Sequence, residues 1–292
     1  MPFKFIHLLL ARMKTIRMAI AYDFDGTLAP GNMQEHSFIP KLGIDSRAFW
    51  QEADCLARTH DADQILTYMQ LMLLKAKEKK LPISRQAFRE HGAEISFFPG
   101  VTGFFDRINS YARQQGVNLE HHIISSGVRD IILGSPIAHH FTNIFASGFI
   151  FDEQDVAIWP ALAINYTTKT QYLFRINKGI GNSYDNSLIN KFIPYEQRPV
   201  RFENMIYIGD GETDVPAMKM IKYQGGTAIA VYDPEGENYE KSLATCRQLL
   251  ADERTDFIAP ADYTEGSKLD RLIHRLIDFA VSRERLDPFR SH

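Results

Sequence analysis

The sequence has few cysteines and no large excess of charge of one sign. Only two of its 292 residues are cysteines, Cys55 and Cys246, and neither lies in a Cys-x-x-Cys or a Cys/His pattern. Their spacing supports neither a disulfide framework nor a zinc site, and two free thiols are typical of a protein in the reducing cytoplasm. The formal net charge is −3 at pH 7, so the chain lacks the basic excess of many nucleic-acid-binding proteins. We therefore expect a cytoplasmic protein with no nucleic-acid partner.

Long apolar runs are also missing. No stretch approaches the roughly 20 apolar residues that a membrane-spanning helix needs. The apolar run at residues 5–10 is shorter than the core of a signal peptide, and no small-residue cleavage site follows it. We expect residues 1–17 to form a tail or a short docking helix, and we expect no membrane partner. The composition, 45% hydrophobic and 24% charged, is otherwise that of a globular protein long enough to bury a sizeable core.

Short apolar runs alternate with amphipathic segments along most of the chain. Apolar runs that end abruptly at polar or glycine residues are typical of buried parallel strands. These patterns predict strands at residues 18–22, 122–124, 205–208, 227–231 and 256–260, a hairpin within 144–164, and helices at 102–115, 168–178, 185–192 and 268–281. The alternation predicts an α/β fold with a Rossmann-like, doubly wound parallel sheet.

A block of helices interrupts this alternation. Apolar residues recur at helical spacing in residues 46–58, 62–80 and 84–94, and Ser84 is a plausible N-cap. We predict an inserted α-helical cap at residues 32–97, a core made of residues 18–31 and 98–292, and hinges at the Pro-Gly pairs before and after the insertion. The aromatic residues of this block, among them Phe49, Trp50 and Tyr68, are expected to form its core.

Polar clusters follow three of the predicted strands. DFDGT (residues 23–27) follows the first strand, SSG (125–127) ends the second, and GDGETD (209–214) follows a later one. Ligands of such sheets bind beyond the carboxyl ends of the strands, so we expect the three clusters to meet at one edge.

The residue types in these clusters suit phosphoryl transfer. The carboxylates of Asp23, Asp25 and Asp210 would repel one another unless a cation lay between them, and Mg²⁺ prefers such oxygen ligands. One carboxylate can attack phosphorus while a second acid protonates the leaving group. A hydroxyl group and a cation should hold the phosphoryl oxygens, and Ser125 and Lys169 are the candidates. Lys178 remains an alternative to Lys169.

Three segments resemble signatures of the haloacid dehalogenase-like (HAD) superfamily. DFDGT resembles the first signature, IISSG (residues 123–127) the second and GDGETD the fourth, in the same order along the chain. The similarity extends from about residue 18 to residue 232. Within the superfamily, the chain is most similar to the phosphoserine phosphatase branch, in which a helical cap also lies between the first two motifs. The resemblance implies a hydrolase acting on phosphoric monoesters.

The resemblance also implies the catalytic roles. Asp23 would be the nucleophile and a Mg²⁺ ligand. Asp25 would be the general acid and base, with its backbone carbonyl on the metal. Lys169, which follows a hairpin and begins a helix as in that branch, would pair with Asp23 and the phosphate.

Four further residues would bind phosphate and metal by the same resemblance. Ser125 would bind the phosphate, and Ser126 would add its backbone N–H. Asp210 would be a metal ligand, and Asp214 would orient a metal-bound water or the lysine.

The segment after the first motif departs from the branch. Phosphoserine phosphatases place an acidic, substrate-reading residue sooner after the nucleophile, whereas here Asn32 stands near that place and Glu35 lies farther on. We expect a small phosphorylated metabolite as substrate, read by polar cap residues such as Gln34 and Glu35. The alternatives are a phosphotransferase or another HAD-type hydrolase, and a non-catalytic protein that binds a phosphorylated ligand.

Overall fold

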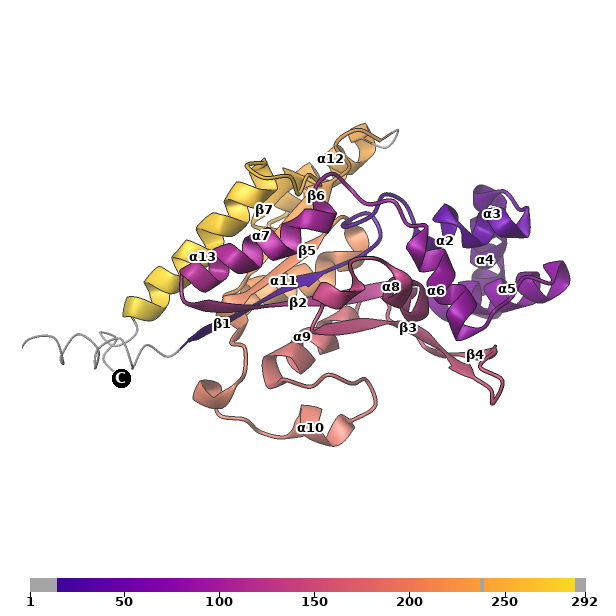
Figure 1. Cartoon of the computed structure of the whole chain (residues 1–292), viewed down its shortest axis with the longest axis horizontal. Coiled ribbons are helices and arrows are strands. Elements are labelled where there is room, and N and C mark those ends of the chain that lie inside the picture. The colour runs from indigo at the N-terminus through magenta and orange to yellow at the C-terminus, as the bar shows by residue number, and fades with distance from the viewer. Residues whose placement is uncertain (1–14, 237–238, 287–292) are drawn as a thin grey trace, which may run out of the picture.

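A seven-stranded sheet runs through the middle of the molecule (Figure 1). The computed structural model describes residues 15–236 and 239–286. The strand order is β4-β3-β2-β1-β5-β6-β7, and all neighbours are parallel except β4, which is antiparallel to β3 at one edge. The strands are β1 (Ile16–Tyr22), β2 (Val117–Val128), β3 (Asn143–Phe151), β4 (Ala157–Leu162), β5 (Met205–Gly209), β6 (Thr227–Tyr232) and β7 (Phe257–Pro260).

Helices connect the strands and fill the long segment after β1. The helices are α2 (Met33–His36), α3 (Phe38–Leu42), α4 (Ser46–His60), α5 (Gln64–Lys79), α6 (Arg85–Ala93), α7 (Val101–Gln114), α8 (Arg129–Gly134), α9 (Lys169–Lys178), α10 (Asn186–Asn190), α11 (Val215–Tyr223), α12 (Tyr239–Ala251) and α13 (Lys268–Leu286). The predicted parallel α/β sheet is confirmed.

The two faces of the sheet are buried by different helices. Along β1, Ile20 and Tyr22 belong to one hydrophobic cluster, while Ala19 and Ala21 belong to another. The first cluster includes residues of α7 and α13, and the second includes residues of α9, α11 and α12. Successive side chains of a strand point to opposite faces, so a strand covered on both sides is apolar throughout. This burial explains why the central strands appear in the sequence as continuous apolar runs.

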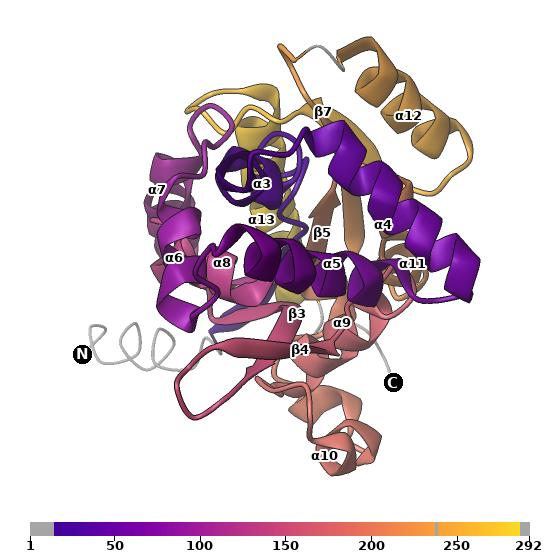
Figure 2. The same cartoon turned by 90° about the vertical axis from the view of Figure 1, so that its right-hand side faces the viewer.

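Helices α2–α6 lie beyond the carboxyl ends of the strands (Figure 1), and Figure 2 looks onto them with the sheet behind. Helix α6 packs very closely on α8. A Cβ atom placed on Gly92 of α6 would lie 1.9 Å from the carbonyl oxygen of Ile131, and one on Gly134 would lie 1.9 Å from that of Arg89. Only glycine allows two backbones to approach in this way. The two glycines therefore allow α6 to pack directly against α8, the helix that follows β2.

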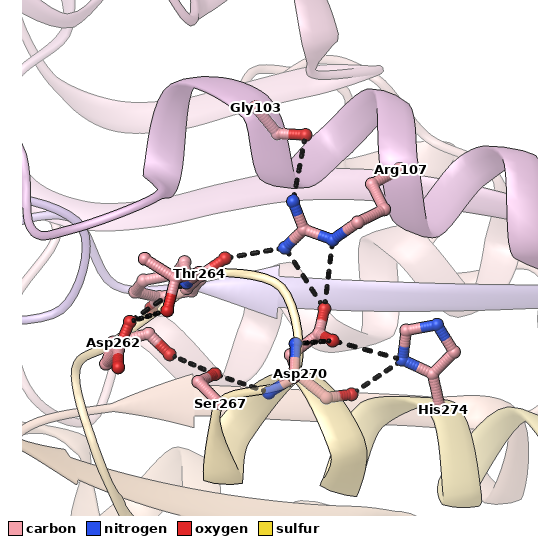
Figure 3. Close-up of polar contacts among 9 residues, drawn as sticks. Gly103, Arg107, Asp262, Thr264, Ser267, Asp270 and His274 are labelled. Carbon is pink, nitrogen blue, oxygen red and sulfur yellow. Dashed lines mark hydrogen bonds and ion pairs between the residues drawn. The ribbon is translucent and has the colours of Figure 1, made fainter.

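A buried ion pair joins the C-terminal helix to α7 (Figure 3). Arg107 donates to Oδ1 of Asp270 from Nε at 3.2 Å and from Nη2 at 3.1 Å, and its Nη2 also donates to the carbonyl oxygen of Tyr263 at 2.6 Å. The Tyr263 hydroxyl group donates to the carbonyl oxygen of Thr27 at 2.9 Å, and its N–H donates to that of Pro99. This network ties the loop before α13 to the DFDGT turn and to the chain segment that leads into α7.

Some local expectations need correction. Residues 1–14 of the expected N-terminal tail lie outside the described residues, while Ile16 and Arg17 belong to β1 because they pair with β2. The helix predicted at 185–192 is only α10. The patterns above do not predict α11 or α12. Within residues 15–236 and 239–286, no helix is long and apolar enough to cross a membrane.

Candidate active site

Three adjacent strands deliver the polar clusters to one place. β2, β1 and β5 are neighbours in the sheet and run parallel. Asp23 follows β1, Ser125 lies near the end of β2, and Asp210 follows β5. All three line one cavity of about 470 Å³ between the sheet edge and helices α2, α4 and α5.

The turn after β1 brings Asp23 close to Asp210. Gly26 has φ +70°, a left-handed conformation that a side chain would strain. A Cβ atom at Gly26 would lie 2.2 Å from Oδ2 of Asp210, so glycine is also needed for space. The N–H of Phe24 donates to Oδ1 of Asp23 at 2.7 Å and thereby orients the carboxylate. Asp23 itself is only 6% exposed.

Lys169 is the cation of the site. It begins α9, is fully buried, and donates from Nζ to Oδ2 of Asp23 and to Oδ1 of Asp214, both at 2.6 Å. Burial favours the neutral amine, but the negative charges of Asp214 and Asp23 outweigh it and raise the pKa of Lys169. The alternative, Lys178, lies at the other end of α9, where its Nζ donates to the carbonyl oxygens of Ile189 and Lys191.

Asp214 is buried, and its carboxylate accepts the second hydrogen bond of Lys169. Its Oδ1 also accepts a hydrogen bond from the Tyr207 hydroxyl group at 2.6 Å, and its Oδ2 accepts one from the N–H of Asp210 at 3.1 Å. Burial and the charge of Asp214 raise the pKa of Tyr207 well above its ordinary value, so this hydroxyl group is a hydrogen-bond donor. Tyr207 was not among the predicted site residues. Its signal in the sequence is a tyrosine within an otherwise apolar buried strand, where the hydroxyl group needs a partner.

The acidic groups at the floor of the cavity can hold a metal ion. One oxygen each from Asp23, Asp210 and Asp214 lies within 4.8 Å of the others. Burial raises the pKa of Asp23 to about 6, with Lys169 opposing the shift and Asp214 adding to it. Burial, Asp214 and Asp23 raise the pKa of Asp210 well above its ordinary value. Such crowded carboxylates need a cation to stay ionised, and this donor set of hard oxygens fits Mg²⁺.

Asp25 lies on the helical side of the same cavity. Its Oδ1 accepts a hydrogen bond from the N–H of Met33, the first residue of α2, at 2.8 Å. Burial raises the pKa of Asp25 well above its ordinary value, and the nearby charge of Asp23 adds to the shift. Its carboxyl group is not part of the three-acid cluster.

The end of β2 turns two serines toward the cavity. The register of β2 against β3 shifts between Ser125 and Val128, which is an irregularity that redirects side chains. Oγ of Ser125 accepts a hydrogen bond from the N–H of Gly127 at 3.0 Å, so its own O–H is available to donate. Oγ of Ser126 is buried and has no hydrogen-bond partner among the residues that the structure describes. Both serines line the cavity.

The helical wall of the cavity differs from the expected core. Phe49 is fully buried, as expected, but Trp50 and Tyr68 line the cavity. Gln34 also lines it, whereas Glu35 is occupied as the acceptor for the indole N–H of Trp50 at 2.5 Å. Glu35 also accepts from the backbone and the side chain of Asn32.

The sequence matches the model of one known protein family. The sequence model described as haloacid dehalogenase-like hydrolase matches residues 20–219, which include every residue of the acidic floor and Lys169. An uncharacterized protein of Borreliella burgdorferi is 30% identical to this chain, over 90% of this chain and 98% of its own length.

Two solved structures have a similar fold. A HAD family hydrolase from Salmonella enterica serovar Typhi has a TM-score of 0.56 at 14% identity, with 95% of this chain and 81% of that chain covered. A phosphoserine phosphatase, solved as an analogue of its phospho-aspartyl intermediate, has a TM-score of 0.53 at 13% identity, with 89% of this chain and 99% of that chain covered.

Proposed function

Because this chain belongs to the haloacid dehalogenase-like hydrolase family, we propose that it is a magnesium-dependent phosphatase that acts through a phosphorylated Asp23. One observation carries the proposal. Asp23 lies at the floor of a cavity with a buried lysine 2.6 Å from its carboxylate and two further carboxylates within 4.8 Å. A nucleophile, a fixed cation and a divalent-metal donor set in one cavity are the parts that phosphoryl transfer requires.

The first half of the reaction transfers the phosphoryl group to Asp23. An oxygen of Asp23 attacks phosphorus, and the bond from phosphorus to the leaving oxygen breaks. Asp25 donates its proton to that oxygen, so an alcohol leaves. Lys169 and the hydroxyl group of Ser125 stabilise the charge on the phosphoryl oxygens. Mg²⁺ held by the carboxylates of Asp23 and Asp210 and by the backbone carbonyl of Asp25 would neutralise phosphate charge and orient the phosphorus for in-line attack.

The second half regenerates the enzyme. Asp25, now ionised, accepts a proton from water as the water attacks the phosphorus of the aspartyl phosphate. The bond between phosphorus and the Asp23 oxygen breaks, and inorganic phosphate leaves. Asp214, which accepts a hydrogen bond from Tyr207, holds Lys169 in place through both halves.

Residues 32–97 form the cap in this proposal. Residues of α2, α4 and α5 line the cavity, and the N–H of Met33 in α2 donates to the carboxylate of Asp25. A cap of this kind excludes bulk water during phosphorylation and restricts the substrate to small metabolites.

Hydrolysis of a generic aryl phosphate tests the proposal. The full chain should hydrolyse it with Mg²⁺, should lose the activity in excess chelator, and should work poorly with Ca²⁺, whose larger and looser coordination suits the site less. Asp23→Asn should abolish turnover. Undiminished hydrolysis in excess chelator, or by the Asp23→Asn variant, contradicts the proposal.

A further inference from the structure

The wall of the cavity beyond the catalytic floor has no basic side chain. Among the described residues that line the cavity there is no lysine, arginine or histidine. Lys169 lies beneath the floor and is already paired with Asp23 and Asp214. A carboxylate on the leaving group would therefore lose its water without gaining a cationic partner, which is strongly unfavourable.

The same wall carries negative charge. Asp54 and Asp233 line the cavity in addition to the acids of the floor. Asp54 pairs with Arg58 at 2.7 Å, but that arginine side chain is 78% exposed and does not line the cavity. Because Lys169 and the proposed Mg²⁺ offset the acids of the floor, the negative charge that the leaving group meets is that of Asp54 and Asp233. A cationic leaving group would be attracted, and an anionic one repelled.

Aromatic side chains form the middle of the wall. The rings of Trp50 and Tyr68 meet edge to face with their centroids 5.4 Å apart. Glu35 binds the indole N–H of Trp50, and Asn32 holds Glu35, so the polar edge of the indole is satisfied. Trp50 and Tyr68 therefore line the cavity with aromatic surface, which attracts ammonium groups.

Gln34 provides an acceptor that has no partner among residues 15–236 and 239–286. The residue is 1% exposed and lines the cavity, yet its Oε1 accepts no hydrogen bond from this part of the chain. The hydroxyl group of Tyr68 donates to the carbonyl oxygen of Ser126 at 2.8 Å, so its oxygen can only accept, and it accepts from the amide of Gln34. This contact fixes the NH₂ end of the amide at Tyr68 and leaves Oε1 free. A buried acceptor of this kind calls for a donor from the ligand, such as an N–H group.

We propose that the substrate is the phosphate monoester of a small amino alcohol, with an ammonium group on the leaving group and no carboxylate. The ammonium group donates to Oε1 of Gln34 and lies against Trp50 and Tyr68, and the acidic wall supplies the opposite charge. The inference rests on the proposed phosphatase activity, because it assumes that the phosphate occupies the floor. It makes Gln34 the residue that recognises the ammonium group.

Binding to the Asp23→Asn chain tests the inference without turnover. Calorimetric titrations with Mg²⁺ present should use phosphoethanolamine, phosphoserine and glycerol 3-phosphate. The first two compounds differ only by a carboxylate, and the third replaces the amine by hydroxyl groups. Phosphoethanolamine should bind at least about tenfold more tightly than either of the others. Equal or tighter binding of phosphoserine or of glycerol 3-phosphate overturns the inference.

A matched pair of variants locates the effect. Gln34→Leu in the same chain should remove the preference for phosphoethanolamine over glycerol 3-phosphate and leave the preference over phosphoserine. Gln70→Leu should keep both preferences, since Oε1 of Gln70 also lacks a partner but this residue does not line the cavity. Phosphocholine, whose ammonium group has no N–H, should bind equally well to both variants. If Gln34→Leu keeps the preference over glycerol 3-phosphate, the assignment of Gln34 is wrong.

Aryl phosphate hydrolysis by the unmodified chain separates the two proposals. Turnover of the aryl phosphate together with preferred binding of phosphoserine rejects the amino-alcohol substrate and keeps the phosphatase. Preferred binding of phosphoethanolamine without any turnover of aryl phosphate keeps the ligand class and rejects the proposed reaction.

Discussion

The ammonium group of Lys169 lies 2.6 Å from Oδ2 of Asp23, although 146 positions separate the two residues in the chain. The strand β1 and the start of α9 meet here, and Asp214 binds the same ammonium group from a third segment. The negative charges of the two carboxylates raise the pKa of Lys169 despite its burial, so the ammonium group stays charged at neutral pH and can bind the phosphoryl oxygens.

The lysine pairing predicts unequal effects at the two ends of α9. Lys169→Met should lower kcat/KM for an aryl phosphate at least about a hundredfold, because a fixed charge next to the developing phosphoryl charge is lost. Lys178→Met should have little effect, since Nζ of Lys178 binds two carbonyl oxygens near α10, at the end of α9 away from Asp23. Steady-state kinetics of both variants check this. A larger loss in Lys178→Met contradicts the assignment of Lys169.

The position of Asp25 predicts a dependence on the leaving group. Asp25→Asn should slow hydrolysis of an alkyl phosphate at least about a hundredfold, because an alkoxide needs a proton to leave. The loss should be smaller for an aryl phosphate with an acidic phenol. Comparison of kcat for the two substrates measures the difference, and equal losses would show that Asp25 is not the acid.

A buried neutral histidine predicts lower stability in acid. The Tyr22 hydroxyl group donates to Nδ1 of His121 at 3.0 Å, and Nε2 of His121 donates to Oδ1 of Asn109 at 3.1 Å. Burial lowers the pKa of His121 from 6.5 to about 3, and the neighbouring His122 and His140 add to the shift. Below about pH 6.5, His121 is protonated in the unfolded chain but stays neutral in the folded chain. The contribution of neutral His121 to the free energy of unfolding is therefore complete above that pH and is lost as the pH falls toward 3.

Urea unfolding at about pH 7 and about pH 5 measures this effect. His121 should account for about 2 kcal/mol of the fall in the free energy of unfolding over that range. His121→Gln should be less stable at pH 7 but should show a shallower pH dependence, whereas replacing His60 in the same way should leave the slope unchanged, because it is an exposed residue at the end of α4. An unchanged slope in His121→Gln contradicts the prediction.

The ion pair shown in Figure 3 predicts a loss of stability. The side chain of Asp270 is 4% exposed, and Arg107→Met would leave its carboxylate without a cation. Removal of one partner from a buried pair is costly, and here we expect about 2 kcal/mol because Arg107 is 24% exposed. Chemical unfolding measures the loss. Arg58→Met, which breaks the exposed pair with Asp54, should change stability much less, and similar losses in both variants would contradict the burial argument.

The sequence predicts the parts of the site that strands position. Asp23, Ser125 and Asp210 come at or after the ends of apolar runs, and parallel strands bring such ends to one edge. It could not decide between Lys169 and Lys178, because both are polar ends of one short helix and only the packing of α9 shows which end meets Asp23.

The sequence is less informative about the helical wall. Phe49 and Trp50 are adjacent aromatic residues, and apolar periodicity does not tell which of them faces a cavity rather than the core. The unpartnered Oε1 of Gln34 is likewise a property of packing. The close contact of Gly92 with α8 depends on two glycines far apart in the chain, and nothing in the sequence links them.

The central claim is that Asp23 carries the phosphoryl group, and trapping this species tests it most directly. The full chain would be mixed with an aryl phosphate and Mg²⁺, quenched in acid within the first turnovers, and digested for peptide mass spectrometry. The account predicts an acid-trapped phosphoryl group on Asp23, which is absent from Asp23→Asn and which disappears when the quench is delayed beyond turnover. Hydrolysis that proceeds at full rate with no phosphoryl group on Asp23, or with the group on another residue, would contradict it.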